Sequence, residues 1–284
     1  MLGRKRSGAV VCRSCGRLVG ANETACPNCG ARFPALFGFA PVLRKLGQDF
    51  GFTQLVMGGC GVLYVATLLA DPEGMRGMGG GLFGILSPSR DSLLRFGASG
   101  AWPVLVEGRW WTVLSAGWLH GGILHIVFNL MWLRQLAPAV AEFYGAARMV
   151  LIYTVASMVG FGLSTAGGLV SIGGYRLGGV VSVGASAAIF GLLGALIHYG
   201  KRGGASAISS QVWGWALGLF VLGFLFPAVD NAAHLGGFLG GWLLSRWLDP
   251  LKPERIDHVV GALLCLAATA ASIAASLLVP PALR

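Results

Sequence analysis

The chain has 284 residues, of which 55% are hydrophobic and 11% are charged, and its formal net charge is +10. With a mean hydropathy of +0.71, this composition excludes an ordinary soluble domain and predicts an all-α, polytopic membrane protein.

Residues 1–34 form a cysteine-bearing segment that contains "CRSCGRLVGANETACPNCGARF", with two CxxC pairs separated by ten residues. Each pair places two thiolates on a tight turn, which the following glycine favours, and four sulfur atoms complete a tetrahedral zinc site. So short a segment buries little core, so the metal would supply most of its folding energy. We therefore expect a cytoplasmic zinc ribbon with a structural ion. Disulfide pairing is the alternative, which a reducing compartment disfavours. The expected ligands are Cys12, Cys15, Cys26 and Cys29.

Residues 35–52 have the composition of a linker with an interfacial tendency, and seven apolar runs follow it. Each run is about long enough to cross the hydrocarbon core as a helix, the fifth being short. Six runs make a membrane core over residues 53–250, and residues 251–284 hold an extra transmembrane helix and a tail. The predicted spans are 53–70, 120–139, 149–168, 181–199, 212–226, 231–248 and 258–279.

The Lys and Arg residues are distributed unevenly between the two sides of the membrane that the predicted spans define. If the N-terminus is cytoplasmic, 15 of the 21 Lys and Arg residues fall on the inner side, which is the positive-inside pattern. The excess charge therefore indicates orientation, and we expect no nucleic-acid partner. Residues 1–8 are basic, but no apolar stretch follows them directly, so no cleavable signal peptide is predicted. We expect a bacterial inner membrane protein whose site opens to the outer face.

Strongly polar side chains lie near the starts of the second, fourth and sixth predicted spans. They are His120, His125 and Asn129, then Ser186, then His234. Because successive spans alternate in direction, these three helices begin on the same face, the outer one. Ser186 and His234 each lie about one turn inside the predicted helix start, so we expect them at one depth. Such residues are costly inside a bilayer and are therefore functional candidates.

The residue types in this polar cluster limit the kinds of site that it could form. No HExxH motif and no acidic residue accompanies the cluster, which disfavours a metal site, and the carboxylates lie at span edges or in loops, which disfavours a proton relay. A serine and a histidine remain, the pair that serves as nucleophile and general base. Two GxxxG patterns in "AHLGGFLGG" would let the helices approach closely enough for the two side chains to bond. Free amides at a helix start suit a developing oxyanion.

Three stretches, "HGGILHIVFN", "GASAAIFG" and "AHLGGFLGG", together resemble the rhomboid intramembrane serine proteases. The resemblance covers about residues 50–250 and implies a rhomboid-like six-helix core. It makes Ser186 the nucleophile and His234 the base of a catalytic dyad that needs no cofactor. It also gives supporting roles to His125 and Asn129 (oxyanion hole), His120 (water-access side), Gly184 (the motif glycine) and Phe190 (stacking on the base).

Two positions depart from the family pattern. Thr112 stands where an arginine commonly follows the tryptophan of the first outer loop, which puts that loop's usual interaction in doubt. Ala187 replaces a frequent glycine after the serine, a small change. Asp230, four residues before His234, could orient the imidazole as a third member. We expect instead that Asp230 is a solvent-exposed acid in the loop before the sixth span.

The resemblance implies hydrolysis of a peptide bond in or near a transmembrane segment of a membrane-protein substrate, through an acyl-enzyme on the serine. The expected partners are such substrates and the lipid bilayer. The fifth span could act as a lateral gate. The alternative is a non-catalytic protein that binds membrane clients and uses the zinc ribbon as an adaptor for a cytoplasmic protein partner. A transporter is disfavoured because no inverted repeat with paired broken helices is visible.

Overall fold

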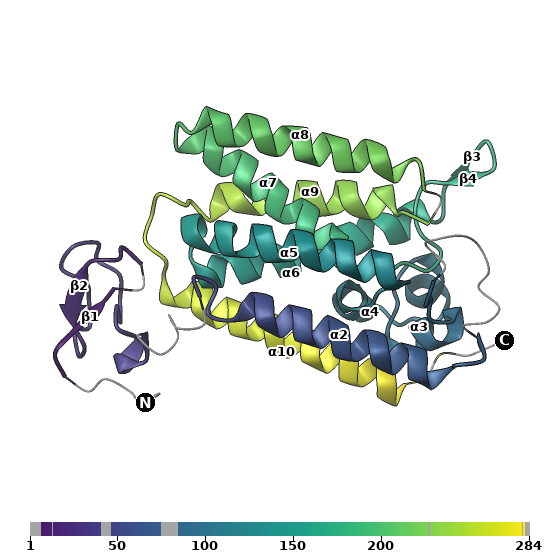
Figure 1. The fold of residues 1–284 in the computed structure, drawn as a ribbon, viewed down its shortest axis with the longest axis horizontal. Coiled ribbons are helices and arrows are strands. Elements are labelled where there is room, and N and C mark those ends of the chain that lie inside the picture. The colour runs from purple at the N-terminus through teal and green to yellow at the C-terminus, as the bar shows by residue number, and fades with distance from the viewer. Residues whose placement is uncertain are drawn as a thin grey trace.

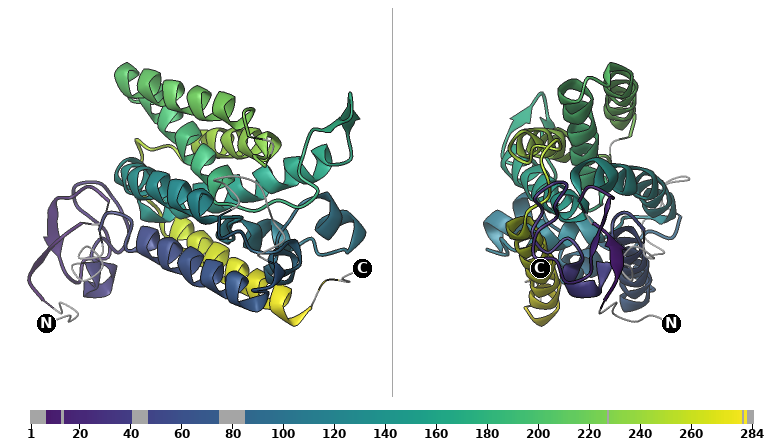
Figure 2. Two further views of the ribbon diagram at one scale, coloured as in Figure 1. Left: turned by 45° about the vertical axis from the view of Figure 1, so that its right-hand side comes forward. Right: turned by 90° about the vertical axis from the view of Figure 1, so that its left-hand side faces the viewer.

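The computed structural model describes residues 7–12, 14–40, 47–74, 85–226, 228–279 and 281. A small N-terminal unit stands at one end of a bundle of long helices (Figures 1 and 2). Residues 41–46 of the predicted linker lie outside the described residues, and the part before them contains a short 3-10 helix at Leu36–Gly38.

The N-terminal unit is built on a two-stranded antiparallel sheet. Strand β1 (Ala9–Val11) pairs with β2 (Leu18–Gly20), and a second hairpin is closed by a bridge between Ala25 and Arg32. Its core consists of small apolar side chains and cysteines, namely Val10, Cys12, Val19, Ala21, Cys26, Ala31 and Ala35. This core is small, as expected for a unit that depends on a metal for its stability.

Among the described residues, seven long helices form the bundle, and each overlaps one predicted span. Their bounds are α2 Phe52–Ala70, α5 Ile123–Tyr144, α6 Ala146–Gly167, α7 Ser186–Arg202, α8 Ser206–Gly223, α9 Asn231–Trp247 and α10 Ile256–Leu278. Within the described residues, α2, α5, α6, α8 and α10 are long and apolar enough to cross a membrane. Helices α7 and α9 have 17 residues each. The prediction of an all-α polytopic membrane protein, with six core helices, a seventh after them and a small ribbon before them, is confirmed.

Helix starts differ from the predictions at the outer end of the bundle. Helix α5 begins at Ile123, so His120 precedes the helix instead of opening it. Helix α7 begins at Ser186, so this serine is the first helical residue and the prediction that it lies one turn inside was wrong. The reason is that the apolar residues before it form irregular backbone that hydrogen-bonds to another loop, so hydrophobicity alone could not show where the helix starts.

Two folded connections cover the end of the bundle opposite the N-terminal unit (Figure 1). The connection from α2 to α5, which we call the outer loop, contains α3 (Arg90–Phe96), η4 (Trp102–Val106), α4 (Thr112–Ser115) and η5 (Ala116–Trp118). The connection from α6 to α7 contains the hairpin of β3 (Ser171–Ile172) and β4 (Tyr175–Arg176). The two connections are joined where Ser99 and Ser182 exchange backbone hydrogen bonds of 3.0 and 2.7 Å.

Helix α9 packs against α7 with one glycine face and against α6 with another. A Cβ atom at Gly237 would lie 2.0 Å from the carbonyl oxygen of Ala187 on α7. A Cβ at Gly236 would lie 2.9 Å from the Cα of Gly160 on α6. The paired glycines of "GGFLGG" therefore let two different helix backbones approach α9, as small residues do between membrane helices.

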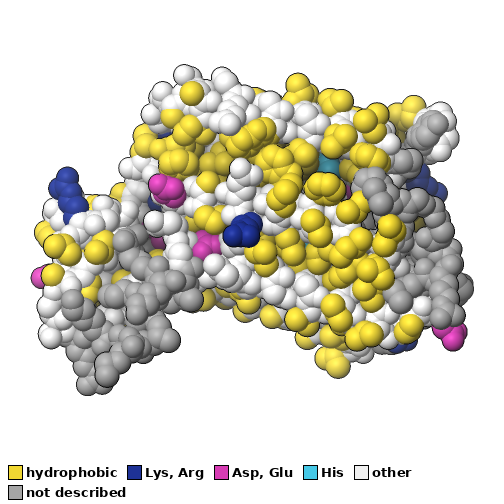
Figure 3. Space-filling model, in the orientation of Figure 1, with side chains coloured by type: hydrophobic (Ala, Val, Ile, Leu, Met, Phe, Trp, Pro, Cys, Tyr) yellow, Lys and Arg dark blue, Asp and Glu magenta, His cyan; other side chains and the backbone are white. Residues whose placement is uncertain are grey.

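The bundle surface is apolar, as a lipid-facing surface requires. Figure 3 shows hydrophobic side chains spread over the face of the helices, with few charged groups among them. On α2 and α10, Val62, Leu69 and Leu264 are 71%, 72% and 64% exposed. Charged residues gather instead at the helix ends and loops, for example Lys201, Arg202, Asp249 and Lys252.

Candidate functional site

Ser186 and His234 meet at the N-terminal ends of α7 and α9. The Nε2 atom of His234 lies 2.9 Å from the Oγ atom of Ser186, within hydrogen-bonding distance. His234 is the fourth residue of α9 and is 8% exposed. The approach of the two helices at Gly237 and Ala187 is what permits this contact, since a side chain at Gly237 would separate the backbones.

The imidazole of His234 is held by an aromatic ring on one face. Phe190, one turn after Ser186 on α7, stacks on it with ring centroids 4.3 Å apart and an interplanar angle of 16°. The Nδ1 atom of His234 is buried and has no hydrogen-bond partner among the described residues. Stacking, together with the bond at Nε2, therefore determines the orientation of this ring.

His125 lies beside the serine with a defined tautomer. Its Nδ1 atom accepts a hydrogen bond of 3.2 Å from the backbone N–H of Gly121, so in the neutral ring the proton is on Nε2. A Cβ atom on Gly184 would lie 2.6 Å from this Nε2 atom and 3.7 Å from Ser186 Oγ. Gly184 has a φ of +128°, a conformation that disfavours any side chain. The Nε2–H donor and the serine hydroxyl thus flank the same glycine.

Asn129 and His120 complete the polar group around His125. The Nδ2 atom of Asn129 donates to the carbonyl oxygen of His125 at 2.8 Å, and its Oδ1 is buried without a partner in the described part of the chain. His120 is fully buried, its ring centroid lies 5.1 Å from that of His125, and neither of its ring nitrogens has a partner among the residues described. Unpaired buried polar atoms are uncommon, and here several lie close to one another, on His120 and Asn129.

Asp230 is partly exposed, and its carboxylate forms no hydrogen bond with the imidazole. Its side chain caps α9 by accepting from the backbone N–H of Ala233 at 3.0 Å. It also accepts hydrogen bonds from the hydroxyls of Ser182, at 2.7 Å, and Ser164. The expected loop acid is therefore partly exposed, but its carboxylate is held by three hydrogen bonds that were not predicted from the sequence. The sequence signal for this contact is the pair of serines, Ser164 and Ser182, that stand within apolar segments.

The outer loop contains a buried arginine despite Thr112. Arg109, just before the tryptophan pair, is 2% exposed and donates to the carbonyl oxygen of Leu94 at 2.7 Å. Thr112 donates from Oγ1 to the carbonyl oxygen of Arg109 at 2.8 Å. The guanidinium of Arg109 therefore anchors this loop from a position upstream of Thr112, where the family commonly has its arginine.

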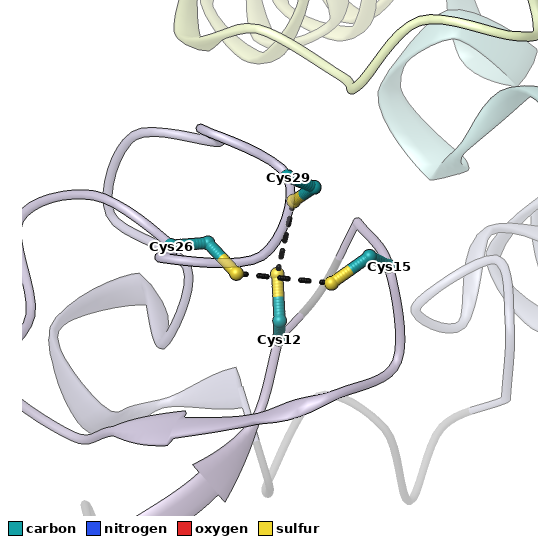
Figure 4. A group of neighbouring side chains, drawn as sticks. All are labelled: Cys12, Cys15, Cys26 and Cys29. Carbon is teal, nitrogen blue, oxygen red and sulfur yellow. Dashed lines mark hydrogen bonds between the residues drawn. The ribbon is translucent and has the colours of Figure 1, made fainter.

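The four cysteines of the N-terminal unit converge on one point (Figure 4). Their sulfur atoms all lie within 4.8 Å of one another, so they could hold a single metal ion. The Sγ atoms are 3.9 Å apart for Cys12 and Cys29, and 3.7 Å apart for Cys15 and Cys26. None of the four forms a disulfide.

Local backbone structure shapes both turns of this cluster and favours a thiolate at Cys26. Gly16 and Gly30, which follow the two CxxC pairs, have φ values of +74° and +72°, so both turns need the left-handed conformation that glycine adopts readily. Burial opposes ionisation of Cys26, but hydrogen bonds from the backbone amides of Asn28 and Cys29 outweigh it and lower the pKa of its thiol to about 6. At Cys12 and Cys29 burial dominates and raises the pKa of the thiol, to about 12 for Cys29. Metal ligands of this type must be deprotonated, so the turns prepare the site.

Comparison with known proteins places the histidine- and serine-bearing helices in one family. Residues 107–249 match the family described as Rhomboid domain. The chain is 36% identical to RHOMBOID-like protein 7 of Arabidopsis thaliana, over 57% of this chain and 50% of that protein. It is 32% identical to Rhomboid protease GluP of Bacillus subtilis (strain 168), over 57% of this chain and 30% of that protein. The matched region thus spans half or less of these two relatives.

Proposed function

Because the chain belongs to the rhomboid family, we propose that it is a serine-type endopeptidase that cleaves membrane proteins within the bilayer. The observation that carries this proposal is the 2.9 Å contact between Ser186 Oγ and His234 Nε2. A nucleophile within hydrogen-bonding reach of its general base, with the base oriented by a third group, is the arrangement that acyl transfer requires. Here the third group is the stacked ring of Phe190.

In the acylation step, His234 Nε2 takes the hydroxyl proton of Ser186 as Oγ attacks the peptide carbonyl carbon. The resulting oxyanion is stabilised by donors at the same place. These are the Nε2–H of His125, the backbone N–H of Ser186 at the uncapped start of α7, and the second N–H of the Asn129 amide. His234 then gives its proton to the leaving amine, and the acyl group stays on Ser186.

In the deacylation step, His234 removes a proton from water as the water oxygen attacks the acyl carbon, and it then returns that proton to Ser186 Oγ as the bond from Oγ to the acyl carbon breaks. Water must therefore reach a buried site. The unpaired ring nitrogens of His120 and the unpaired Oδ1 of Asn129 are groups to which such a water could bond. We assign His120 to the water-entry side and Asn129 to the oxyanion site next to it, with Gly184 keeping the space beside His125 free of a side chain.

The proposed substrates are transmembrane segments of other proteins that unwind locally, because an intact helix shields its own carbonyl groups. A small residue at the cleaved bond suits the narrow space between Gly184 and Ser186. We propose that this catalytic core spans residues 53–250, with 1–34 as the ribbon, 35–52 as the linker and 251–284 as the additional helix and tail.

We propose zinc as the metal of the N-terminal ribbon, in a structural role. In a tetrahedral site with Zn–S bonds of about 2.3 Å, the sulfur atoms lie about 3.8 Å apart, which agrees with the measured separations of 3.7 and 3.9 Å. Four thiolates leave no open coordination position for chemistry. The ion would fold the ribbon, which stands at the end of the bundle opposite the dyad.

The proposed orientation places the ribbon in the cytoplasm and the dyad near the outer face of a bacterial inner membrane. The basic residues at the ribbon end of α7, α9 and α10 support it, since Lys201, Arg202, Arg246, Lys252 and Arg255 all lie there. Cationic loops remain preferentially on the cytoplasmic side. Helices α5, α7 and α9 then all begin at the outer side, where the site residues lie.

Labelling with a fluorophosphonate tests the proposal, because this reagent reacts with an activated serine and does not need a transmembrane substrate. We expect mass spectrometry of the folded wild-type protein to locate the adduct on Ser186, and we expect the His234→Ala variant to remain unlabelled. Absence of an adduct in the folded wild-type protein would overturn the proposal and favour a non-catalytic membrane-client binder.

A further inference from the structure

Helix α10 buries a row of small polar side chains although much of its surface is apolar and exposed. Thr269, Ser272 and Ser276 are 5%, 3% and 0% exposed, whereas Leu263 and Leu264 on the other face are 61% and 64% exposed. Thr269 satisfies its hydroxyl within α10 by donating to the carbonyl oxygen of Cys265. Buried hydroxyl groups are costly unless they are hydrogen-bonded, so the partners of the two serines indicate what this face contacts.

Both serines bond to the outer loop. Ser272 Oγ donates to the carbonyl oxygen of Trp111 at 2.6 Å, and the indole Nε1 of Trp111 donates to Ser276 Oγ at 3.1 Å. The buried guanidinium of Arg109 donates to the carbonyl oxygen of Ser276 at 3.1 Å. The fit is close, since a Cβ atom on Gly97 would lie 2.5 Å from Ser276 Oγ. The last turns of α10 are therefore fastened to the outer loop by three hydrogen bonds.

The outer loop in turn holds the backbone that leads into α7. Besides the paired bonds between Ser99 and Ser182, Ala101 and Trp102 donate from their amides to residues 179 and 180, at 3.0 and 3.1 Å. The amide of Gly184 donates to the carbonyl oxygen of Ala116 at 3.0 Å. Gly184 is two residues before Ser186, so these bonds determine where the serine and the donors beside it lie.

The structure assigns to α10 the role of a positioning element for Ser186, exerted through the outer loop. We infer that Ser272 and Ser276 are positioning residues, because they hold Arg109 and Trp111 of the outer loop. The amide of Arg109 donates to the carbonyl oxygen of Pro103 at 2.9 Å, and Thr112 Oγ1 donates to Ser99 Oγ at 3.3 Å. These contacts connect residues 109–112 to residues 99–103, which together with Ala116 hold the backbone of residues 179–184. This inference rests on the proposed function. It gives the helix outside the six-helix core a part in the reaction.

The test compares the rate of fluorophosphonate labelling of Ser186 in full-length variants, with the melting temperature measured in parallel. The double variant Ser272→Ala/Ser276→Ala should be labelled about tenfold more slowly, because two of the three hydrogen bonds between α10 and the outer loop are lost. The matched control is Ala271→Ser/Ala274→Ser, on the exposed face of the same turns, and it should be labelled like wild type. Ser272→Thr keeps the hydroxyl and should restore most of the rate relative to Ser272→Ala.

Wild-type labelling rates in the folded double variant would overturn the inference. If that variant does not fold, Trp111→Phe replaces it, since this change removes only the indole donor to Ser276. Hydrogen exchange at the amides of Ser182 and Gly184 is measured as well, because it does not depend on catalysis. If the wild-type protein itself is not labelled, the proposed function fails. The hydrogen-exchange result then tests the positioning role by itself: faster exchange at these two amides in the double variant, but not in the control, would support it, and unchanged exchange would overturn it.

Discussion

At the residue scale, the site is defined by what each imidazole bonds to. His234 contacts Ser186 through Nε2 and stacks on Phe190, whereas His125 accepts from Gly121 and keeps its proton on the nitrogen nearer to Ser186. One histidine is thus arranged to accept a proton and the other to donate a hydrogen bond. Their different partners separate the two roles.

The donor role of His125 predicts the effect of its removal. His125→Ala should lower kcat about 100- to 1,000-fold, the usual loss for one oxyanion donor, with a smaller change in KM. Steady-state cleavage of a detergent-solubilised transmembrane substrate measures both constants. Phe128→Ala, on the exposed side of the same helix, is the control. An unchanged kcat in His125→Ala would remove this residue from the oxyanion site.

For Asp230 we predict a different pattern, in which substitution lowers the stability of the protein and leaves its activity nearly unchanged. Asp230→Asn keeps a good helix cap but cannot accept from the hydroxyls of both Ser164 and Ser182 as the carboxylate does. We expect the free energy of unfolding to fall by about 1–2 kcal/mol, with kcat nearly unchanged well below the melting temperature. Asp257→Asn at the exposed ion pair with Arg255 is the control. A large fall in kcat would show that Asp230 acts on His234.

The sequence located the side chains of the candidate site but not their contacts. Ser186 and His234 stood out because polar residues are rare in apolar spans, and the glycines of α9 indicated close helix packing. The partners of Asp230 and the burial of Arg109 depend on loops folding over the helix ends. No periodicity in the sequence reports such loop contacts.

At the element scale, α9 is the helix that brings the two halves of the site together. It approaches α7 through Gly237 and α6 through Gly236, and both contacts are too close for a methyl group. The helix positions could be predicted because long apolar runs are distinctive. The start of α7 could not, since the apolar residues before Ser186 bond to the outer loop instead of extending the helix.

Two neighbouring glycines on α6 test the packing. A Cβ atom on Gly160 would lie 2.6 Å from the carbonyl oxygen of Ala233, whereas one on Gly162 would meet nothing within 4 Å. Gly160→Ala should therefore lower the free energy of unfolding by about 1–3 kcal/mol. Gly162→Ala should leave it equal or slightly raised, because alanine is the better helix former. Thermal unfolding in detergent compares the two, and equal melting temperatures would contradict the close approach of α6 and α9.

At the scale of the whole molecule, the ribbon and the proposed catalytic site stand at opposite ends of the bundle. A hydrogen bond from the Glu254 amide to Ser14 Oγ, at 3.3 Å, joins the ribbon to the loop before α10. The ribbon has its own small core. Its folding should therefore depend on its metal, while the dyad should not.

Metal analysis separates these two dependences. We expect one zinc ion per wild-type chain, and we expect Cys26→Ser to lose the ion and to become sensitive to proteolysis within residues 7–34. Fluorophosphonate labelling of Ser186 should be unchanged in this variant. A wild-type chain without metal, or a metal-free variant whose ribbon still resists proteolysis, would contradict the zinc assignment.

Cleavage of a transmembrane substrate in proteoliposomes tests the central proposal most directly. The measurement compares wild type with Ser186→Ala, each reconstituted with a tagged single-span substrate, and locates the cut bond by mass spectrometry of the products. We predict that the wild-type protein cuts within or beside the substrate's membrane segment and that Ser186→Ala yields no product. Product formation by folded Ser186→Ala at the wild-type rate would contradict the account.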